Sequence, residues 1–271
     1  MKRLFSIASW NVEHFKNDTA RIDRIINFLK LQTADVFALY EVESSVVYDS
    51  LVSNFPDYNF HITEGAQTQE ILVGARNSLT SFFTQKTEFK SGNTYLRPGA
   101  LLTIRIDDED YPILFLHTKS STEPIGLGIR DDMFSRAFTF KKFLDGISVK
   151  AGKGNSNFIF LGDLNIMGMD YPYNKEITFK QELKKLSDDA AKIKMRVLTK
   201  NSNFTWWNGP TSRMKPMSLD QVVVSEQIQF SLFKKKEVDV RGWVNENTDA
   251  AKGNWIKNYS DHSLLYFEIV K

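Results

Sequence analysis

The sequence FIFLGDLNIMG, from Phe158 to Gly168, contains the pattern that decides the fold. Four apolar or aromatic residues lead into Gly162, and a carboxylate, Asp163, and a carboxamide, Asn165, follow. A short apolar run that ends at glycine is typical of a buried strand. If the segment stays extended, the spacing places both polar side chains on the same side. Taken alone, however, Asp or Asn after a strand favours a turn, because these side chains cap nearby backbone groups.

Polar side chains of the kinds used in catalysis adjoin several other predicted strands. They are Asn11 in IASWN, Glu41 in VFALYE, His117 in ILFLH, Asp163 and Asn165 in IFLGDLN, Asp220 in SLDQVVV, and Asp261 with His262 in YSDHSLLYFEI. Strand ends share an edge of a sheet, so these side chains are expected to converge on one cleft. Each residue alone is more often structural, and it is their joint occurrence that favours a catalytic site.

Composition indicates a globular protein with one domain. Of the 271 residues, 42% are hydrophobic and 25% charged, and no linker or internal repeat divides the chain. We therefore expect a single domain over residues 1–271. The absence of cysteine excludes disulfide scaffolds, thiol catalysis and zinc–thiolate sites. A net charge of +2 argues against a protein that packages nucleic acid, but it permits a nuclease in which only the cleft is basic.

The N-terminal sequence MKRLFSIASWNVEH predicts a first strand rather than a secretion signal. Its apolar run is short and is interrupted by Ser6 and Ser9. No apolar segment approaches the roughly 20 residues that a membrane span needs. We therefore expect a cytoplasmic protein without a membrane span, and no feature indicates an obligate protein partner.

Hydrophobic periodicity predicts alternating strands and helices. Strands are predicted at Leu4–Trp10, Val36–Tyr40, Glu70–Ala75, Ala100–Ile106, Ile113–His117, Phe158–Leu161, Leu219–Val224 and Leu264–Ile269. One helix is predicted from Ile22, Ile25, Ile26 and Leu29, which recur at helical spacing after an N-cap at Asp18 or Thr19. Two more are predicted at Arg130–Ile147 and Glu176–Val197. This pattern is typical of an α/β protein with two packed sheets and helices outside.

The motifs and their order resemble the endonuclease/exonuclease/phosphatase superfamily, which has the fold of pancreatic-type deoxyribonuclease. The matching segments are SWNVEHF, LYEVES, QEILVGARN, YLRPGALL, LHTKS, FLGDLNI, TWWNGPTSRMKPMSLDQVVVS and YSDHSLLYF. The resemblance implies a four-layer α/β sandwich, in which two packed mixed β-sheets are flanked by helices. It also implies hydrolysis of phosphoester bonds with Mg²⁺ or Mn²⁺, and Ca²⁺ is a further candidate.

By this resemblance, Glu41 is the main metal ligand, with Asn11 and Asp261 close to the metal. Asn11 is also a candidate phosphate contact. Carboxylate oxygens are hard ligands, which Mg²⁺ prefers, and one or two of them suffice because the ion keeps several waters.

The resemblance also assigns the groups that act on the phosphate. Asp163 would orient the attacking water or bind metal, and Asn165 would donate to a phosphate oxygen. His262 would act as general base or contact the phosphate. A carboxylate on the other ring nitrogen fixes the tautomer of such a histidine, and Asp220 would supply it.

A second carboxylate–imidazole pair follows from the deoxyribonuclease branch of the superfamily. There Glu70 would orient His117, and His117 would serve as general acid to the leaving oxygen. Arg97 matches a family arginine near the phosphate, where a guanidinium suits bidentate contact. Lys119 could add positive potential, and Trp206 could stack on a base or pack in the core.

Three functions remain open at this level. The first is a nuclease acting on DNA or RNA, although Tyr40 replaces the usual glutamine, and Glu13 and Glu43 stand where basic residues are usual. Acidic residues there would weaken contact with a polyanion. The second is a phosphatase or phosphodiesterase on an inositol phosphate or a lipid such as sphingomyelin. The third is a binding module without catalysis, which would be expected to lose these residues.

Overall fold

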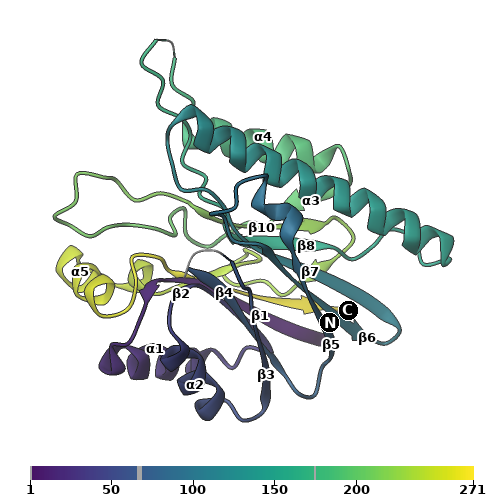
Figure 1. The fold of residues 1–271 in the computed structure, drawn as a ribbon, viewed down its shortest axis with the longest axis horizontal. Coiled ribbons are helices and arrows are strands. Elements are labelled where there is room, and N and C mark those ends of the chain that lie inside the picture. Colours follow the sequence, from purple (N-terminus) through teal and green to yellow (C-terminus); the bar gives the residue numbers. More distant parts are fainter. Residues whose placement is uncertain (1, 66–68, 174) are drawn as a thin grey trace.

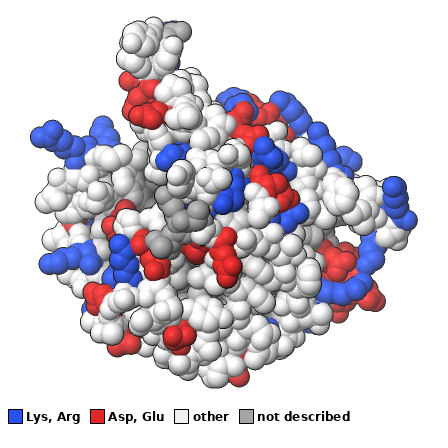
Figure 2. All heavy atoms as spheres, in the orientation of Figure 1, with Lys and Arg blue, Asp and Glu red and all other residues white. Residues whose placement is uncertain are grey.

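The computed structural model describes residues 2–65, 69–173 and 175–271. Two β-sheets lie face to face, and helices cover the outer face of each sheet, as Figure 1 shows. The predicted four-layer α/β sandwich of two mixed sheets is confirmed. No helix in the described ranges is both long and apolar enough to span a membrane. On the face drawn in Figure 2, acidic and basic side chains are interspersed.

The first sheet is built around the N-terminal and C-terminal strands. Its strand order in the described residues is β11-β13-β1-β2-β4-β3, with β12 also paired to β13. Its strands are β1 (Arg3–Phe15), β2 (Val36–Val42), β3 (Tyr58–Ile62), β4 (Glu70–Arg76), β11 (Gln229–Phe230), β12 (Asp239–Arg241) and β13 (Leu264–Val270). The pairing of β1 with β2 is parallel, and the other pairings are antiparallel.

The second sheet contains the motif with which the sequence analysis began. Its strand order in the described residues is β5-β6-β7-β8-β10-β9. Its strands are β5 (Thr80–Lys86), β6 (Gly99–Ile106), β7 (Glu109–His117), β8 (Ile159–Asp163), β9 (Met195–Val197) and β10 (Asp220–Ser225). Parallel pairing of β7 with β8 and antiparallel pairing of β10 with β8 bring His117 and Asp220 into register with Asp163.

The core lies in three layers, one between the sheets and one under each set of helices. Buried aliphatic and aromatic residues from both sheets, among them Phe5, Phe115 and Leu161, fill the central layer. The helices are α1 (Thr19–Gln32), α2 (Ser45–Asn54), α3 (Pro124–Lys150), α4 (Phe179–Ala191) and α5 (Asp249–Asn258), with short 3₁₀ turns η1 (Thr87–Lys90) and η2 (Trp243–Asn245). Helices α1, α2 and α5 lie against the first sheet, and α3 and α4 lie against the second (Figure 1).

All eight predicted strands are present, but one predicted helix is wrong at its end. The segment Glu176–Val197 was expected to be one helix, whereas α4 ends at Ala191 and β9 follows. The helix begins at a capping box, in which Thr178 and Gln181 bond reciprocally. The chain then enters the sheet because Val197 pairs with Val223 of β10, a long-range contact that local periodicity does not encode.

Several elements were not predicted. Helices α2 and α5 are short, each ten residues long, and their apolar faces are narrow. Five strands were also not predicted: β3, β5, β9, β11 and β12. Strands at sheet edges bury one face or less, so apolar and polar residues alternate only weakly along them. Helix α3 is longer than the predicted Arg130–Ile147 because it begins at Pro124, a residue suited to a first helical turn.

Two strands continue beyond the polar residues at which they were expected to end. Strand β1 includes Asn11 and runs on to Phe15, and β2 includes Glu41. The pairing register shifts at both places, and Glu41 has a φ of 64°. Such irregularities redirect side chains and are common beside active sites. Here they mark where the first sheet contributes to the cleft.

Candidate active site

A cavity of about 330 Å³ collects most of the predicted polar residues. It is lined by Glu13, His14, Glu41, His117, Ser120, Asp163, Asn165, Met167, Trp206, Met214, Met217, Leu219, Asp261 and His262. These residues come from both sheets and from the loops at one edge of the sandwich. The expected convergence on a single cleft therefore occurs.

The predicted pair of Asp220 and His262 is present at the base of this cavity. Nδ1 of His262 lies 2.9 Å from Oδ2 of Asp220, and both residues are buried. The backbone N–H of His262 donates to the hydroxyl of Ser260, which in turn donates to the carbonyl of Asn11. This chain of bonds fixes the imidazole, so that Nε2 faces Asp163 at 3.7 Å from Oδ2.

Asp163 stands at the centre of the site. Its Oδ2 accepts a 2.9 Å hydrogen bond from the side-chain amide of Asn11, and Nε2 of His117 lies 3.5 Å from the same oxygen. The same Asn11 amide donates to Oε1 of Glu41 at 3.1 Å. Asn11 thus holds two carboxylates beside each other, and in this structure both amide hydrogens are engaged within the protein rather than free for phosphate.

Burial and neighbouring charges set the protonation of the central groups. Burial raises the pKa of Asp163 to about 7, and the charges of Asp220 and Glu41 act in the same direction. Burial alone would lower the pKa of His262, but the carboxylates of Asp220 and Asp163 outweigh it and raise that pKa well above its usual value. The neighbouring carboxylates therefore favour His262 as the cation.

The segment after β8 is not extended, which corrects one expectation. Asn165 has a φ of 46°, so it does not simply continue the side of the strand on which Asp163 lies. Its amide donates to the carbonyl of Thr118 at 3.2 Å, and its backbone N–H caps Oδ1 of Asp163 at 3.1 Å. Gly162 is required here, since a Cβ would lie 2.1 Å from the carbonyl oxygen of Leu116.

The predicted pairing of Glu70 with His117 is not formed. Glu70 accepts from the hydroxyl of Thr63 at 2.5 Å and from the backbone N–H of Gly65 at 2.8 Å. Nδ1 of His117 has no hydrogen-bond partner in the described part of the chain. The physical reason is placement: Glu70 begins a strand of the first sheet and His117 ends one of the second, and local loop groups satisfy the carboxylate.

The state of His117 also argues against its expected role as general acid. Burial lowers its pKa well below the usual value, and the nearby charges of Arg97 and His262 act in the same direction. A neutral imidazole results, which can donate one hydrogen bond from a ring N–H. Nε2 lies 3.7 Å from Oε1 of Glu41, so the ring is placed to hold carboxylates.

Two predicted basic residues lie beside the cavity rather than in its lining. Arg97 donates to the carbonyl of Gln69 at 2.9 Å and also contacts its side-chain amide oxygen. Burial lowers the pKa of Arg97, while Glu41 and Asp163 are close enough to oppose that shift. Lys119 is half-buried, and its carbonyl accepts a hydrogen bond from Arg130.

Asp261 and Trp206 form one wall of the cavity. Nε1 of Trp206 donates to Oδ2 of Asp261 at 2.6 Å, which holds the indole in place. The other oxygen, Oδ1, is buried and has no hydrogen-bond partner among the described residues. Burial raises the pKa of Asp261, and the charge of Glu41 adds to the rise. Nε2 of His262 lies 3.9 Å from this oxygen, too far for a hydrogen bond, so a bound cation could still satisfy Oδ1.

The donor set fits a hard divalent cation. Glu41 and Asp261 offer carboxylate oxygens at the cavity, and oxygen ligands of this kind suit Mg²⁺ or Mn²⁺. The side-chain oxygen of Asn11 accepts from the backbone N–H of Glu13 at 2.9 Å and keeps a second lone pair. Two of the predicted metal residues, Glu41 and Asp261, therefore line one cavity, and Asn11 bonds to Glu41.

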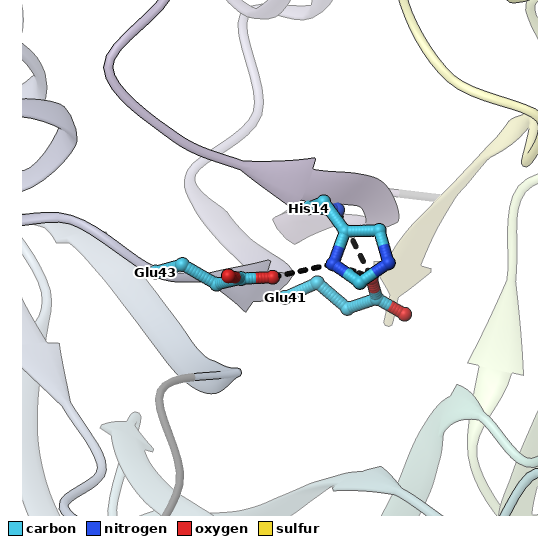
Figure 3. Close-up of side chains that lie close together, drawn as sticks. All are labelled: His14, Glu41 and Glu43. Atoms are coloured by element: carbon cyan, nitrogen blue, oxygen red, sulfur yellow. Dashed lines mark hydrogen bonds and ion pairs between the residues drawn. The ribbon is translucent and has the colours of Figure 1, made fainter.

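A second cluster of possible ligands adjoins the first at Glu41. Figure 3 shows the imidazole of His14 between Glu41 and Glu43, with Nδ1 of His14 2.6 Å from Oε1 of Glu43. Candidate ligand atoms of the three residues lie within 4.8 Å of one another. Lys16 also reaches Glu43, at 3.3 Å, so the acidic charge of Glu43 is locally compensated.

Sequence reasoning missed one buried residue that supports the site. Arg130 has no solvent exposure, and its five N–H groups reach acceptors on Glu182, Lys119, Ser121 and Gly168. Two of these acceptors follow His117 in the chain, and Gly168 follows Asn165. A signal was available, since an arginine on the apolar face of a predicted helix needs a buried partner.

A family comparison agrees with this geometry. The model of the Endonuclease/Exonuclease/phosphatase family matches residues 8–262. The chain belongs to this family. It is therefore a family hydrolase that acts on phosphoester bonds, as a phosphodiesterase or a phosphatase. No curated protein sequence matches the chain.

Solved structures share the fold at low sequence identity. Truncated TDP2 from Caenorhabditis elegans has a TM-score of 0.67 at 15% identity, and the match covers 98% of each chain. TDP2 from D. rerio, solved with a single-strand DNA product, has a TM-score of 0.65 at 16% identity over 98% of this chain and 99% of that one. A mannosyl-6-phosphatase from Bacteroides thetaiotaomicron has a TM-score of 0.59 at 16% identity, over 98% of this chain and 100% of that one.

Proposed function

We propose that this protein is a metal-dependent phosphodiesterase that cleaves nucleic acid, DNA in the first place and RNA as the alternative. The observation that carries the proposal is the joint placement of Asp163, the Asp220–His262 pair and Glu41 around one cavity. Hydrolysis of a phosphodiester needs an oriented water, a cationic contact to the phosphate and neutralisation of charge on the leaving oxygen. Asp163 would orient the water, His262 would contact the phosphate, and a cation held at Glu41 would neutralise charge.

The water attacks phosphorus in line with the leaving oxygen. Asp163 accepts a hydrogen bond from that water and takes its proton as the new phosphorus–oxygen bond forms. The bond from phosphorus to the leaving oxygen breaks, and that oxygen takes a proton from solvent. His262, held by Asp220, donates from Nε2 to a non-bridging phosphate oxygen.

Negative charge on the phosphate would be stabilised at the side of the cavity where Glu41 and Asp261 lie. A divalent cation at Glu41 and Asp261 would supply Lewis-acid chemistry by drawing charge from the phosphate oxygens. Asn11 keeps Glu41 and Asp163 together by donating to both carboxylates. His117 supports the same two carboxylates as a neutral ring, and Arg97 adds positive potential behind them.

Nucleic acid is favoured as substrate because the acidic residues that opposed it are partly compensated. Glu43 is paired with Lys16 and His14, and burial raises the pKa of Glu13, so its negative charge is disfavoured. The likeness to a D. rerio TDP2 structure that holds a DNA product adds to this support. The second candidate is a phosphatase on a small phosphoester, which the likeness to a mannosyl-6-phosphatase favours.

A substrate panel tests the proposal. Purified protein with Mg²⁺ or Mn²⁺ is incubated with single-stranded and duplex DNA, an abasic duplex, RNA, an inositol phosphate, mannose 6-phosphate and bis(p-nitrophenyl) phosphate. Asp163→Ala serves as the control for contaminating activity. Cleavage of nucleic acid that is lost in the variant supports the proposal. Turnover of the monoesters alone would instead support the second candidate, a phosphatase that acts on a small phosphoester.

A further inference from the structure

A large groove lies next to the catalytic cavity and shares a wall with it. Its volume is about 930 Å³, near the upper end of the roughly 300–1,000 Å³ typical of ligand pockets. Met214 and Met217 line both the groove and the catalytic cavity. Methionine side chains are unbranched and adaptable, so this shared wall can adjust to a bound ligand. The groove has no part in the chemistry assigned above.

The groove is basic. Lys180, Lys200 and Lys215 line it, and no acidic residue of the described chain does. Lys180 and Lys215 are exposed and form no ion pair within the described residues. Lys200 points inward and donates to the carbonyl of Asp220 at 2.6 Å, which fixes the start of β10. Two uncompensated ammonium groups therefore lie beside a site that handles phosphate.

Other lysines of α4 behave differently. Lys184 contacts Asp188 at 2.5 Å, and Lys185 contacts Asp131 and Asp189 at 2.5 and 2.8 Å. These lysines form ordinary surface pairs, whereas Lys180 on the same helix does not. On α4, the lysine that lines the groove is therefore unpaired among the described residues, whereas these two lysines outside it are neutralised by aspartates.

The groove also offers apolar surface at which a base can stack. Phe204 is 41% exposed and Met214 is 49% exposed, so both offer apolar surface to a ligand in the groove. Phe179 and Leu183 of α4 also line the groove. Aromatic side chains beside cationic groups are the combination that binds single-stranded nucleic acid, since every base has a face that stacks.

We propose that this groove holds a short single-stranded stretch of nucleic acid adjoining the phosphate in the catalytic cavity. The inference rests on the proposed function and extends it to a defined binding surface. An acyl chain would also suit the apolar wall, but a phospholipid carries its phosphate at one place only. Free cations at both Lys180 and Lys215 match a strand with successive phosphates better.

Binding of a labelled single-stranded DNA oligonucleotide, followed by fluorescence anisotropy, tests the proposal. The Asp163→Ala background with Mn²⁺ prevents turnover. Phe204→Ala should weaken binding about 5- to 150-fold, the range expected for one stacked base. Lys180→Ala with Lys215→Ala should reduce the slope of log Kd against log salt by about 1.4, or 0.7 for each lost phosphate contact.

A matched control and a minimal substrate separate the groove from the chemistry. Lys184→Ala with Lys185→Ala removes the same charge from α4 outside the groove and should leave the salt slope nearly unchanged. In the catalytically competent protein, all groove variants should retain kcat/KM for bis(p-nitrophenyl) phosphate, which has a single phosphate and no neighbouring nucleotides.

Each contrary outcome has a separate meaning. Unchanged oligonucleotide affinity in the groove variants, with DNA still hydrolysed, would refute the groove and leave the proposed function standing. Hydrolysis of the minimal diester without binding of any oligonucleotide would refute both. Binding of phosphatidylcholine vesicles that Phe204→Ala weakens, with no oligonucleotide binding, would identify a lipid site and overturn the proposal.

Discussion

Replacement of Arg130 by methionine tests whether its buried guanidinium keeps two loops in position, the one that follows His117 and the one that follows Asn165. Arg130 contacts Glu182 at 2.6 and 3.0 Å and donates to the carbonyls of Lys119, Ser121 and Gly168 at 3.1, 2.7 and 2.8 Å. Arg130→Met leaves the Glu182 carboxylate buried without its partner, which costs about 3–5 kcal/mol. We expect the free energy of unfolding to fall by that amount.

Measurement of turnover shows whether Arg130 positions the loops or only stabilises the fold. Arg130→Met with Glu182→Leu removes the uncompensated carboxylate, so part of the lost stability should return. The loop carbonyls still lack their donor, so kcat for the minimal diester should stay well below that of wild type at a temperature where both proteins are folded. KM should change less, because the groups that contact substrate are intact.

Urea unfolding followed by circular dichroism, together with steady-state kinetics, makes these measurements. Arg136→Met is the matched control, because Arg136 forms an exposed pair with Asp132 on the same helix. That substitution should cost less than about 1 kcal/mol and leave kcat unchanged. A cost below about 1 kcal/mol for Arg130→Met would refute the reasoning about the buried pair, and full recovery of kcat in the double variant would refute the positioning role.

The remaining predictions concern residues within the cavity. Asp163→Ala should lower kcat by orders of magnitude while the thermal unfolding midpoint changes little. His262→Ala should lower kcat similarly and should also lower the midpoint, because it leaves the buried Asp220 carboxylate without its partner. Near-normal turnover in either variant would remove the role given to that residue. His117→Ala should lower turnover more than Glu70→Gln does, since the two side chains are not paired. Equal large losses of kcat in those two variants would indicate that the pair forms when substrate binds.

Much of the site could be predicted from the residues at strand ends, because pairing of neighbouring strands brings those residues together. His117 and Asp163 end neighbouring parallel strands, and Asp220 begins the antiparallel strand paired with Asp163, so the apolar runs beside these residues already imply that they meet. The partnership of Asp220 with His262 required the family resemblance in addition, because β10 and β13 belong to different sheets. The alternation of strands and helices predicted two packed sheets with helices outside, and the family resemblance implied the four-layer sandwich.

The errors arise at contacts, some local and some between distant segments, that hydrophobic periodicity and motif spacing do not reveal. The expected pairing of Glu70 with His117 failed because Thr63 and Gly65, residues near Glu70 in the chain, satisfy the carboxylate first. The left-handed conformation of Asn165 depends on its bond to Thr118, which no spacing rule reveals. Arg130 looked like one more residue of a helix, and its partners lie 9 to 52 positions away.

The most direct test of the central claim is hydrolysis of a single-stranded DNA oligonucleotide before and after removal of metal. The intact protein with Mn²⁺ should cleave the oligonucleotide, EDTA should abolish cleavage, and Mn²⁺ added in excess should restore it. Glu41→Gln should show a reduced heat of Mn²⁺ binding in titration calorimetry, as well as low activity. Undiminished cleavage after thorough chelation would contradict a metal-dependent phosphodiesterase at this site.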